Sequence, residues 1–138
     1  MDSLGFISSL SGVIELASHI AQYKSYEAKD AQIFYIMNDA QVLKGLLQEV
    51  TEIVLNAKYR PRESVIGALE SCKNSAAKFG DIIRYHETEG KWQQRFKQVI
   101  SKKKIYSSYR NFRDSVLLLK DAATLQVSHT SPSAQLIV

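Results

Sequence analysis

The sequence predicts an all-α protein, an antiparallel helical bundle of four main helices. Apolar residues recur at alternating gaps of three and four in four separate segments, and this is the period of an amphipathic helix. Only two prolines and six glycines interrupt the 138 residues, while the good helix formers Ala, Leu, Lys, Gln and Glu recur between them. The length suits one hydrophobic core, so we expect a single domain.

The first predicted helix spans residues 4–23 and carries few charges. Asp2 or Ser3 can cap it, because either side chain accepts a hydrogen bond from a free backbone N–H. Glu15 is the only acid after the cap, and Gly12 costs about 1 kcal/mol relative to Ala. Close approach of a neighbouring helix is the simplest explanation for this glycine. The apolar stripe consists of Phe6, Leu10, Val13, Ala17 and Ile20, widened by Ile7, Ile14 and Ala21.

The second and third helices have equally regular stripes. Residues 28–57 predict a helix about 45 Å long at ~1.5 Å per residue, whose partners must also be long if its stripe is to be covered. Pro61 predicts the start of the third helix, because proline lacks an N–H and fits a first turn. The stripes are Ile33, Ile36, Ala40, Leu43, Leu47, Val50 and Val54, then Val65, Leu69, Cys72, Ala76, Phe79 and Ile83. Cys72 is therefore expected to be a buried, unreactive thiol.

The last helical segment changes phase along its length. After Gly90, an apolar series at Trp92, Phe96 and Ile100 is out of register with the next stripe. We therefore expect the last helix to be kinked or split near residues 101–104. That next stripe is Ile105, Tyr109, Phe112, Val116, Leu119 and Ala123. The bundle is expected to occupy residues 1–127, with residues 128–138 forming a flexible tail or the start of a linker.

The net charge of +4 is concentrated in one segment. Residues 1–90 carry −3, residues 91–113 carry +8, and the remainder carries −1. The basic patch consists of Lys91, Arg95, Lys97, Lys102, Lys103, Lys104, Arg110 and Arg113. It is either a solvated helix face or a surface for anionic phospholipid, where each cation contributes about 1 kcal/mol. Nucleic acid is disfavoured, because most of the interleaved aromatic residues coincide with core positions.

The sequence carries no recognisable reaction chemistry. His19, His86 and His129 have no metal-ligand spacing, and there is neither a phosphate loop nor a nucleophile elbow. We expect no catalytic residue, metal or cofactor, and a protein that is not an enzyme. The single cysteine excludes an intrachain disulfide, and residues 1–3 lack a basic secretory n-region, so we expect a cytoplasmic protein.

The first helix has two interpretations. It can be an ordinary core helix, or a core helix with a second, membrane-associated state. Its uncharged run, residues 3–14, is shorter than the ~20 residues of a membrane span, so a permanent span is not expected. A helix with so few charges can nevertheless leave a bundle for a bilayer at a lower cost than a charged one.

The order of these features resembles the fungal HeLo-like N-terminal domain over residues 1–125. Asp2-Ser3-Leu4 leads into a serine-rich apolar helix with Gly12, followed by Tyr23, Tyr26 and a long leucine-rich helix. Three lysines at 102–104 then precede Tyr-Arg-Asn-Phe-Arg-Asp-Ser-Val-Leu-Leu-Leu at 109–119. The family often has proline after the first aspartate, where this chain has Ser3. Such domains are similar in plan to the four-helix executioner domain of the mixed-lineage kinase-like necroptosis protein.

The resemblance implies a cell-death or heterokaryon-incompatibility signalling domain of NOD-like receptors or amyloid-regulated effectors. Oligomerisation would expose the first helix, which would then permeabilise the plasma membrane. The implied partners are anionic phospholipid, further copies of the chain, and a receptor or amyloid-signalling protein. The alternative is an adaptor or oligomerisation bundle that never touches lipid. The candidate membrane-contacting residues are Leu4, Phe6, Ile7, Leu10, Val13, Ile14 and Leu16.

Overall fold

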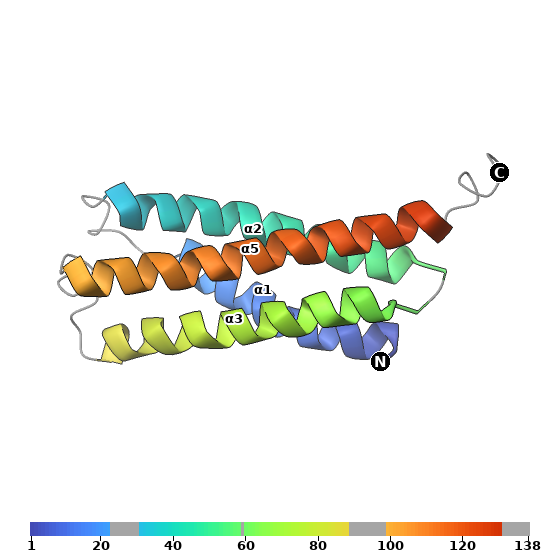
Figure 1. Ribbon diagram of the computed structural model, residues 1–138, viewed down its shortest axis with the longest axis horizontal. Coiled ribbons are helices and arrows are strands. Elements are labelled where there is room, and N and C mark those ends of the chain that lie inside the picture. The colour runs from blue at the N-terminus through green and yellow to red at the C-terminus, as the bar shows by residue number, and fades with distance from the viewer. Residues whose placement is uncertain (23–30, 59, 89–98, 131–138) are drawn as a thin grey trace.

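The structure is a computed structural model that describes residues 1–22, 31–58, 60–88 and 99–130. In these ranges the chain forms four α-helices and no strand. The helices are α1 (Ser3–Ala21), α2 (Ala31–Asn56), α3 (Glu63–Thr88) and α5 (Val99–Thr130). They lie lengthwise against one another as a bundle (Figure 1). The predicted fold class, an all-α bundle of four main helices, is confirmed.

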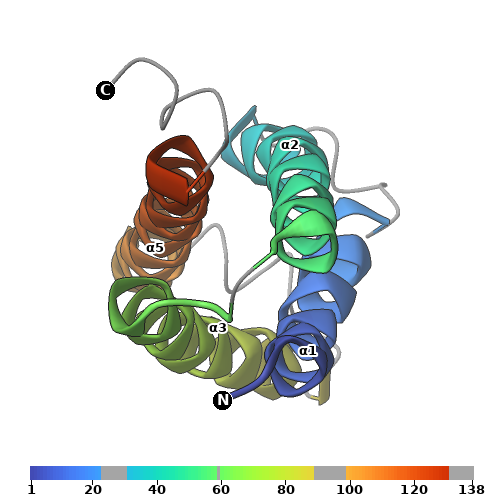
Figure 2. The ribbon, with the colours of Figure 1, turned by 90° about the vertical axis from the view of Figure 1, so that its right-hand side faces the viewer.

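The helices are not arranged around the bundle in chain order. Both α1 and α5 pack against α2 and α3, so α1 lies diagonally across from α5, and α2 across from α3 (Figure 2). The chain between α2 and α3 crosses the end of the bundle to make this arrangement possible. As a result α1–α2 and α3–α5 are antiparallel neighbours, whereas α2–α5 and α1–α3 run parallel (Figure 1).

The core is built from the predicted stripes. Phe79 of α3 sits among aromatic rings of α5, with ring centroids 5.4 Å from Tyr109 and 6.4 Å from Phe112. The side chains of Ile33 and Ile83 lie outside the described residues. The buried stripe residues are Phe6, Leu10, Val13, Ala17, Ile20, Ile36, Ala40, Leu43, Leu47, Val50, Val54, Val65, Leu69, Cys72, Ala76, Phe79, Ile105, Tyr109, Phe112, Val116, Leu119 and Ala123.

The expected split of the last helix at residues 101–104 is absent, because α5 is continuous over Val99–Thr130. Ser-Lys-Lys-Lys at these positions contains no proline or glycine that would break a helix, and lysine is a good helix former. Gly90, Trp92 and Phe96, on which the expectation depended, lie outside the described residues. The helix also continues past the expected boundary at residue 127, and residues 131–138 lie outside the described part.

The helix starts differ slightly from the predicted ones. Asp2, rather than Ser3, caps α1, since its Oδ1 accepts a hydrogen bond from the Gly5 N–H at 2.7 Å. Pro61 lies buried in the connection, and α3 begins at Glu63. Arg62 takes the capping position, because its carbonyl accepts the first helical hydrogen bonds of α3.

Candidate membrane-contact site

α1 has a buried face, an exposed face and two partly buried flanks. Among the seven candidate membrane-contacting residues, Leu4 is 75% exposed. Phe6, Leu10 and Val13 are buried in the core, and the remaining three, Ile7, Ile14 and Leu16, are partly buried. The exposed face consists of Leu4, Ser8, Ser11, Gly12, Glu15, His19 and Gln22. In this conformation most of the candidate residues face α2 and α3, so lipid contact would require α1 to leave the bundle.

By length and composition, α1 is the one helix in the described ranges that could cross a membrane. Its 19 residues are about 29 Å long at ~1.5 Å per residue, close to the ~30 Å hydrocarbon core of a bilayer. The uncharged run of residues 3–14 is shorter than α1, because the apolar helix continues past Glu15 to Ala21. The expectation that this segment is too short to span a membrane was based on the uncharged run alone. A core helix of a soluble protein passes the same test, and here α1 contributes five residues to the core.

Gly12 does not serve a close helix contact, so that expectation is wrong. It lies on the exposed face of α1, and a Cβ built there would have no other atom within 4 Å. The helix neighbours of α1 lie against its other faces. Gly12 therefore weakens the helix without a packing gain in this conformation.

Gly12→Ala is expected to raise the free energy of unfolding by about 1 kcal/mol, because alanine restricts the unfolded chain and favours the helix. Urea denaturation followed by circular dichroism measures the change. Gly5→Ala is the matched control on the same helix. A Cβ at Gly5 would lie 3.0 Å from the capping Oδ1 of Asp2, so we expect a smaller gain or a loss. A loss of stability in Gly12→Ala would contradict the exposed placement.

The basic patch is only partly within the described residues. Lys91, Arg95 and Lys97 lie outside them, as does the side chain of Lys102 on α5. The other α5 cations are described: Lys103, Lys104 and Arg110 are exposed, whereas Arg113 is partly buried. The Arg110 guanidinium lies 5.3 Å from the centre of the Tyr106 ring, a cation–π contact.

Arg113 is engaged in a polar network between α2 and α5. Asp39 Oδ2 accepts a hydrogen bond of 2.6 Å from the Tyr109 hydroxyl and lies 3.2 Å from Arg113 Nε. The Asp39 carboxylate raises the pKa of Arg113 above its ordinary value. Burial, followed by the contact with Asp39, raises the pKa of Tyr109 as well. Arg113 is therefore paired with Asp39 in this conformation and is not a free cation of the patch.

The two predicted parts of the site do not meet in this conformation. α1 and α5 lie diagonally across the bundle (Figure 2). Their N-terminal turns, which carry Leu4 on α1 and Lys103 and Lys104 on α5, are at opposite ends (Figure 1). A membrane-binding surface that includes both α1 and the cations of α5 would have to form after a rearrangement of the bundle.

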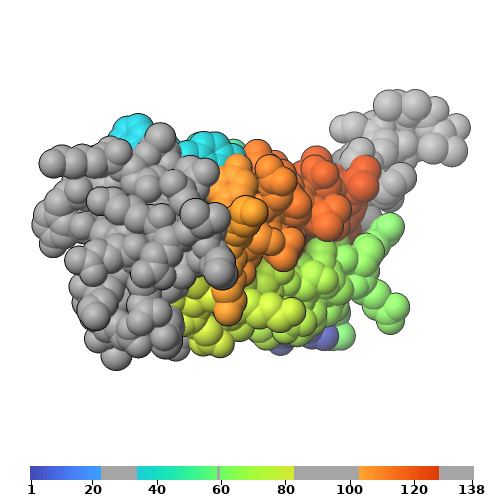
Figure 3. Space-filling view, turned by 60° about the vertical axis from the view of Figure 1, so that its left-hand side comes forward, coloured from blue at the N-terminus to red at the C-terminus, as the bar shows by residue number. Residues whose placement is uncertain are grey.

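Three further features of the described residues bear on chemistry: the Cys72 thiol, the distribution of possible metal ligands, and a groove between α3 and α5. Cys72 is buried as predicted, and burial raises its pKa to about 11, so the thiol stays protonated at neutral pH. In the described ranges, no three His, Cys, Asp or Glu side chains gather as metal ligands. A groove of about 280 Å³ lies between α3 and α5, which run side by side along one face of the molecule (Figure 3). Its lining consists of Ser75, Lys78, Ser108, Asn111, Asp114, Ser115 and Leu118.

Two polar contacts were missed at the sequence level. The pairing of Asp39 with Tyr109 and Arg113 has no local signal, because it joins positions 70 or more residues apart. Gln126, in contrast, continues the gap pattern of the last stripe three residues after Ala123, and it is buried. Its neighbour Leu125 is exposed.

No protein-family model, curated protein or solved structure matches the chain. The likeness to the HeLo-like domain therefore depends on the order of sequence features alone, and a membrane role is a matter for proposal and test.

Proposed function

We propose that this protein is a non-enzymatic signalling domain of HeLo-like type in fungal cell death or incompatibility. Its α1 would permeabilise an anionic membrane after oligomerisation, so the domain would move from the cytoplasm to the plasma membrane on activation. The observation that supports this proposal best is α1 itself. It is apolar and long enough to cross a bilayer, and Glu15 is its only acid. A receptor or an amyloid-signalling partner would supply the clustering.

The cost of releasing α1 explains why clustering is needed. Its four large buried side chains are Phe6, Leu10, Val13 and Ile20. Exposing each one costs roughly 1.5–3 kcal/mol, or roughly 6–12 kcal/mol for the helix. That is comparable with the whole stability of a typical domain, about 5–15 kcal/mol. A single copy should therefore keep α1 in the bundle, and release becomes favourable where lipid covers the same apolar face and clustering raises the local concentration.

In the released state α1 would act as an amphipathic membrane helix. Its core stripe, together with Ile7, Ile14 and Leu16 on the flanks and Leu4 in the first turn, would contact acyl chains. The exposed face with Ser8 and Glu15 would keep contact with water or with neighbouring copies. Lys103, Lys104 and Arg110 of α5, together with the rest of the basic patch, would lie at the head groups.

Leu4→Glu is expected to slow dye release from vesicles of phosphatidylcholine and phosphatidylserine by about tenfold or more. The domain is clustered for this assay by fusion to an oligomeric carrier. Removing one leucine from the apolar phase costs roughly 1.5–3 kcal/mol, and each 1.4 kcal/mol is about tenfold. Leu4 suits this test because it is 75% exposed, and a glutamate in the first turn is compatible with the helix dipole. Circular dichroism and urea denaturation check that the bundle is intact.

Leu118→Glu is the matched control, because Leu118 is also well exposed, at 63%, but lies on α5. It introduces the same charge, and we expect dye release at the wild-type rate. Equal rates for wild type and Leu4→Glu would contradict the role of α1. Intact vesicles in the presence of demonstrably clustered wild-type domain would contradict the membrane function altogether.

The adaptor function remains the second candidate, because the bundle presents apolar side chains without any rearrangement. Phe34 and Val42 of α2 and Leu118 and Leu125 of α5 are exposed, and exposed apolar side chains commonly mark protein contacts where they are contiguous. An adaptor would leave vesicles intact. Its self-association, measured by sedimentation, would weaken in Leu118→Glu and not in Leu4→Glu, the reverse of the order expected for membrane permeabilisation.

A further inference from the structure

Gln126 joins the end of α5 to the chain that connects α2 and α3. Its side chain is only 7% exposed. The Nε2 group donates a hydrogen bond to the Arg60 carbonyl at 3.1 Å, and Oε1 accepts one from the Arg62 N–H at 2.9 Å. Both ends of the amide are thus paired with the main chain of one short segment, the segment that crosses the bundle diagonally (Figure 2).

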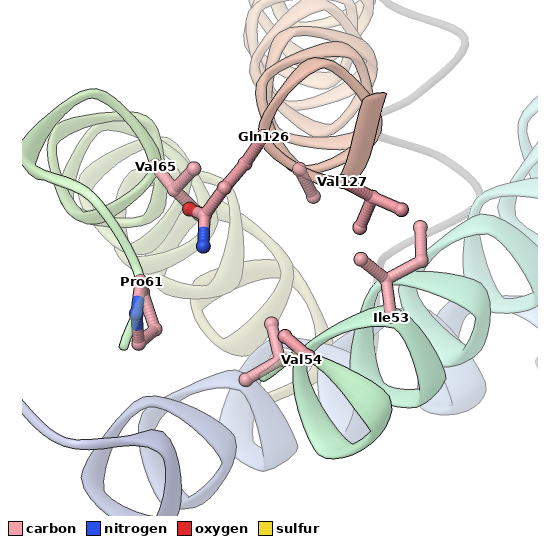
Figure 4. A pocket seen from close by; sticks show the side chains of 8 residues that line it. Ile53, Val54, Pro61, Val65, Gln126 and Val127 are labelled. Atoms are coloured by element: carbon pink, nitrogen blue, oxygen red, sulfur yellow. The ribbon is translucent and has the colours of Figure 1, made fainter. Parts of the chain in front are cut away.

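Apolar side chains surround the Gln126 end of these hydrogen bonds, which are partly buried. Ile53 and Val54 of α2, Pro61 of the connection and Val65 of α3 line a pocket together with Gln126 (Figure 4). The cavity between them is about 10 Å³, which is barely the space that one water molecule requires. Loss of the Gln126 hydrogen bonds would therefore remove two partly buried contacts that tie the connection to the end of α5.

The same connection joins the two helices between which α1 packs. α2 and α3 lie diagonally and make little direct contact, so at this end their separation depends on the connection and on the helices between them. α1 packs between these two helices, and its first turn is at the end of the bundle where the connection crosses (Figure 1). Opening the connection would therefore allow both helices against which α1 packs to move at this end of the bundle.

We infer that Gln126 is a positioning residue that latches α1 in the bundle through the connection between α2 and α3. When the last turns of α5 shift, the two hydrogen bonds break, the connection opens and the first turns of α1 become exposed before the bundle unfolds. This inference deepens the proposed function, because it identifies the contact that controls release of α1. It depends on that function only for what α1 does once it is free.

Hydrogen exchange followed by mass spectrometry, without any membrane, tests the latch. The variant is Gln126→Met, which keeps the length and helix propensity of the side chain but lacks its hydrogen-bonding amide. We expect the connection and residues 3–13 of α1 to exchange about tenfold faster, in line with the loss of two partly buried hydrogen bonds. The exchange rate in the middle of α5, residues 105–119, should rise only by the small amount that follows from the loss of global stability.

Val116→Ala is the control for a loss of stability alone, because Val116 lies fully buried in the core and outside the latch. In this variant the hydrogen-exchange rate should rise evenly in all four helices. Gln126→Glu keeps the acceptor for Arg62 but loses the donor to Arg60, and we expect an intermediate effect on α1. Faster exchange confined to the connection, or spread evenly as in Val116→Ala, would overturn the latch. Because the assay contains no lipid, its outcome is independent of vesicle dye release.

Discussion

Phe6→Ala is expected to lower the free energy of unfolding by about 3–5 kcal/mol, the usual cost of removing a buried phenylalanine. Phe6 is completely buried, and its removal leaves a cavity that the long neighbouring helices cannot easily close. Leu4→Ala, on the same helix and two positions away, is expected to change stability by less than about 0.5 kcal/mol, because Leu4 is mostly exposed. Urea denaturation measures both changes.

The contrast between these two variants tests which face of α1 the bundle buries. Similar losses for Phe6→Ala and Leu4→Ala would show that α1 is not held by its predicted stripe. The expected loss for Phe6 is a large share of the 5–15 kcal/mol that a domain typically has. A charge at Phe6 would therefore confuse unfolding with a membrane defect, which is why Leu4 is the better position for the vesicle assay.

Asp39→Ala is expected to lower the free energy of unfolding by about 2–3 kcal/mol, and this is the second largest effect that we expect. The substitution leaves the Tyr109 hydroxyl without its partner in the interior, and a hydrogen bond to a charged group contributes about 1.5–3 kcal/mol. Arg113 adds little to this estimate, since its side chain is 38% exposed and solvent screens the pair. Thermal and urea denaturation both report the change.

Tyr109→Phe completes a double-mutant cycle with Asp39→Ala and has its own pH dependence. The raised pKa of Tyr109 means that the folded state holds the proton more tightly than the unfolded state. Its contribution to stability is therefore complete below the ordinary tyrosine pKa of about 10 and is lost as pH rises above it. Wild type should lose more stability than Tyr109→Phe above pH ~10. Additive losses in the cycle would contradict a direct Asp39–Tyr109 interaction.

The contacts between α2 and α5 also indicate why these two helices run side by side in parallel. Acidic side chains of α2 contact polar and basic side chains of α5. The residue numbers of the partners increase in the same direction along both helices, as expected for a parallel pair. Asp39 pairs with Tyr109 and Arg113, and Glu49 lies 2.9 Å from Lys120. Such partly exposed pairs contribute little energy, but a shift of register would separate both. We interpret them as features that select this neighbour and register.

The amino-acid sequence by itself determined the helices and their buried faces. The stripes of α1, α2, α3 and α5 became the core at every predicted position whose side chain is described, because helical periodicity is a property of the local sequence. Cys72 was placed correctly for the same reason. Helix ends moved by a few residues, as at Pro61 and Glu63, where contacts from another helix contribute to the start.

Only the tertiary structure decided which helices are neighbours and which polar groups meet. A stripe shows that a helix has a partner without specifying which one, so the diagonal connection between α2 and α3 could not be read from any single segment. The same limit applies to Gly12, which proved exposed, and to Arg113, which is paired with Asp39. It also applies to Gln126, whose two partners are more than 60 residues away. Each depends on surfaces brought together from distant parts of the chain, and these contacts form only once the bundle has packed.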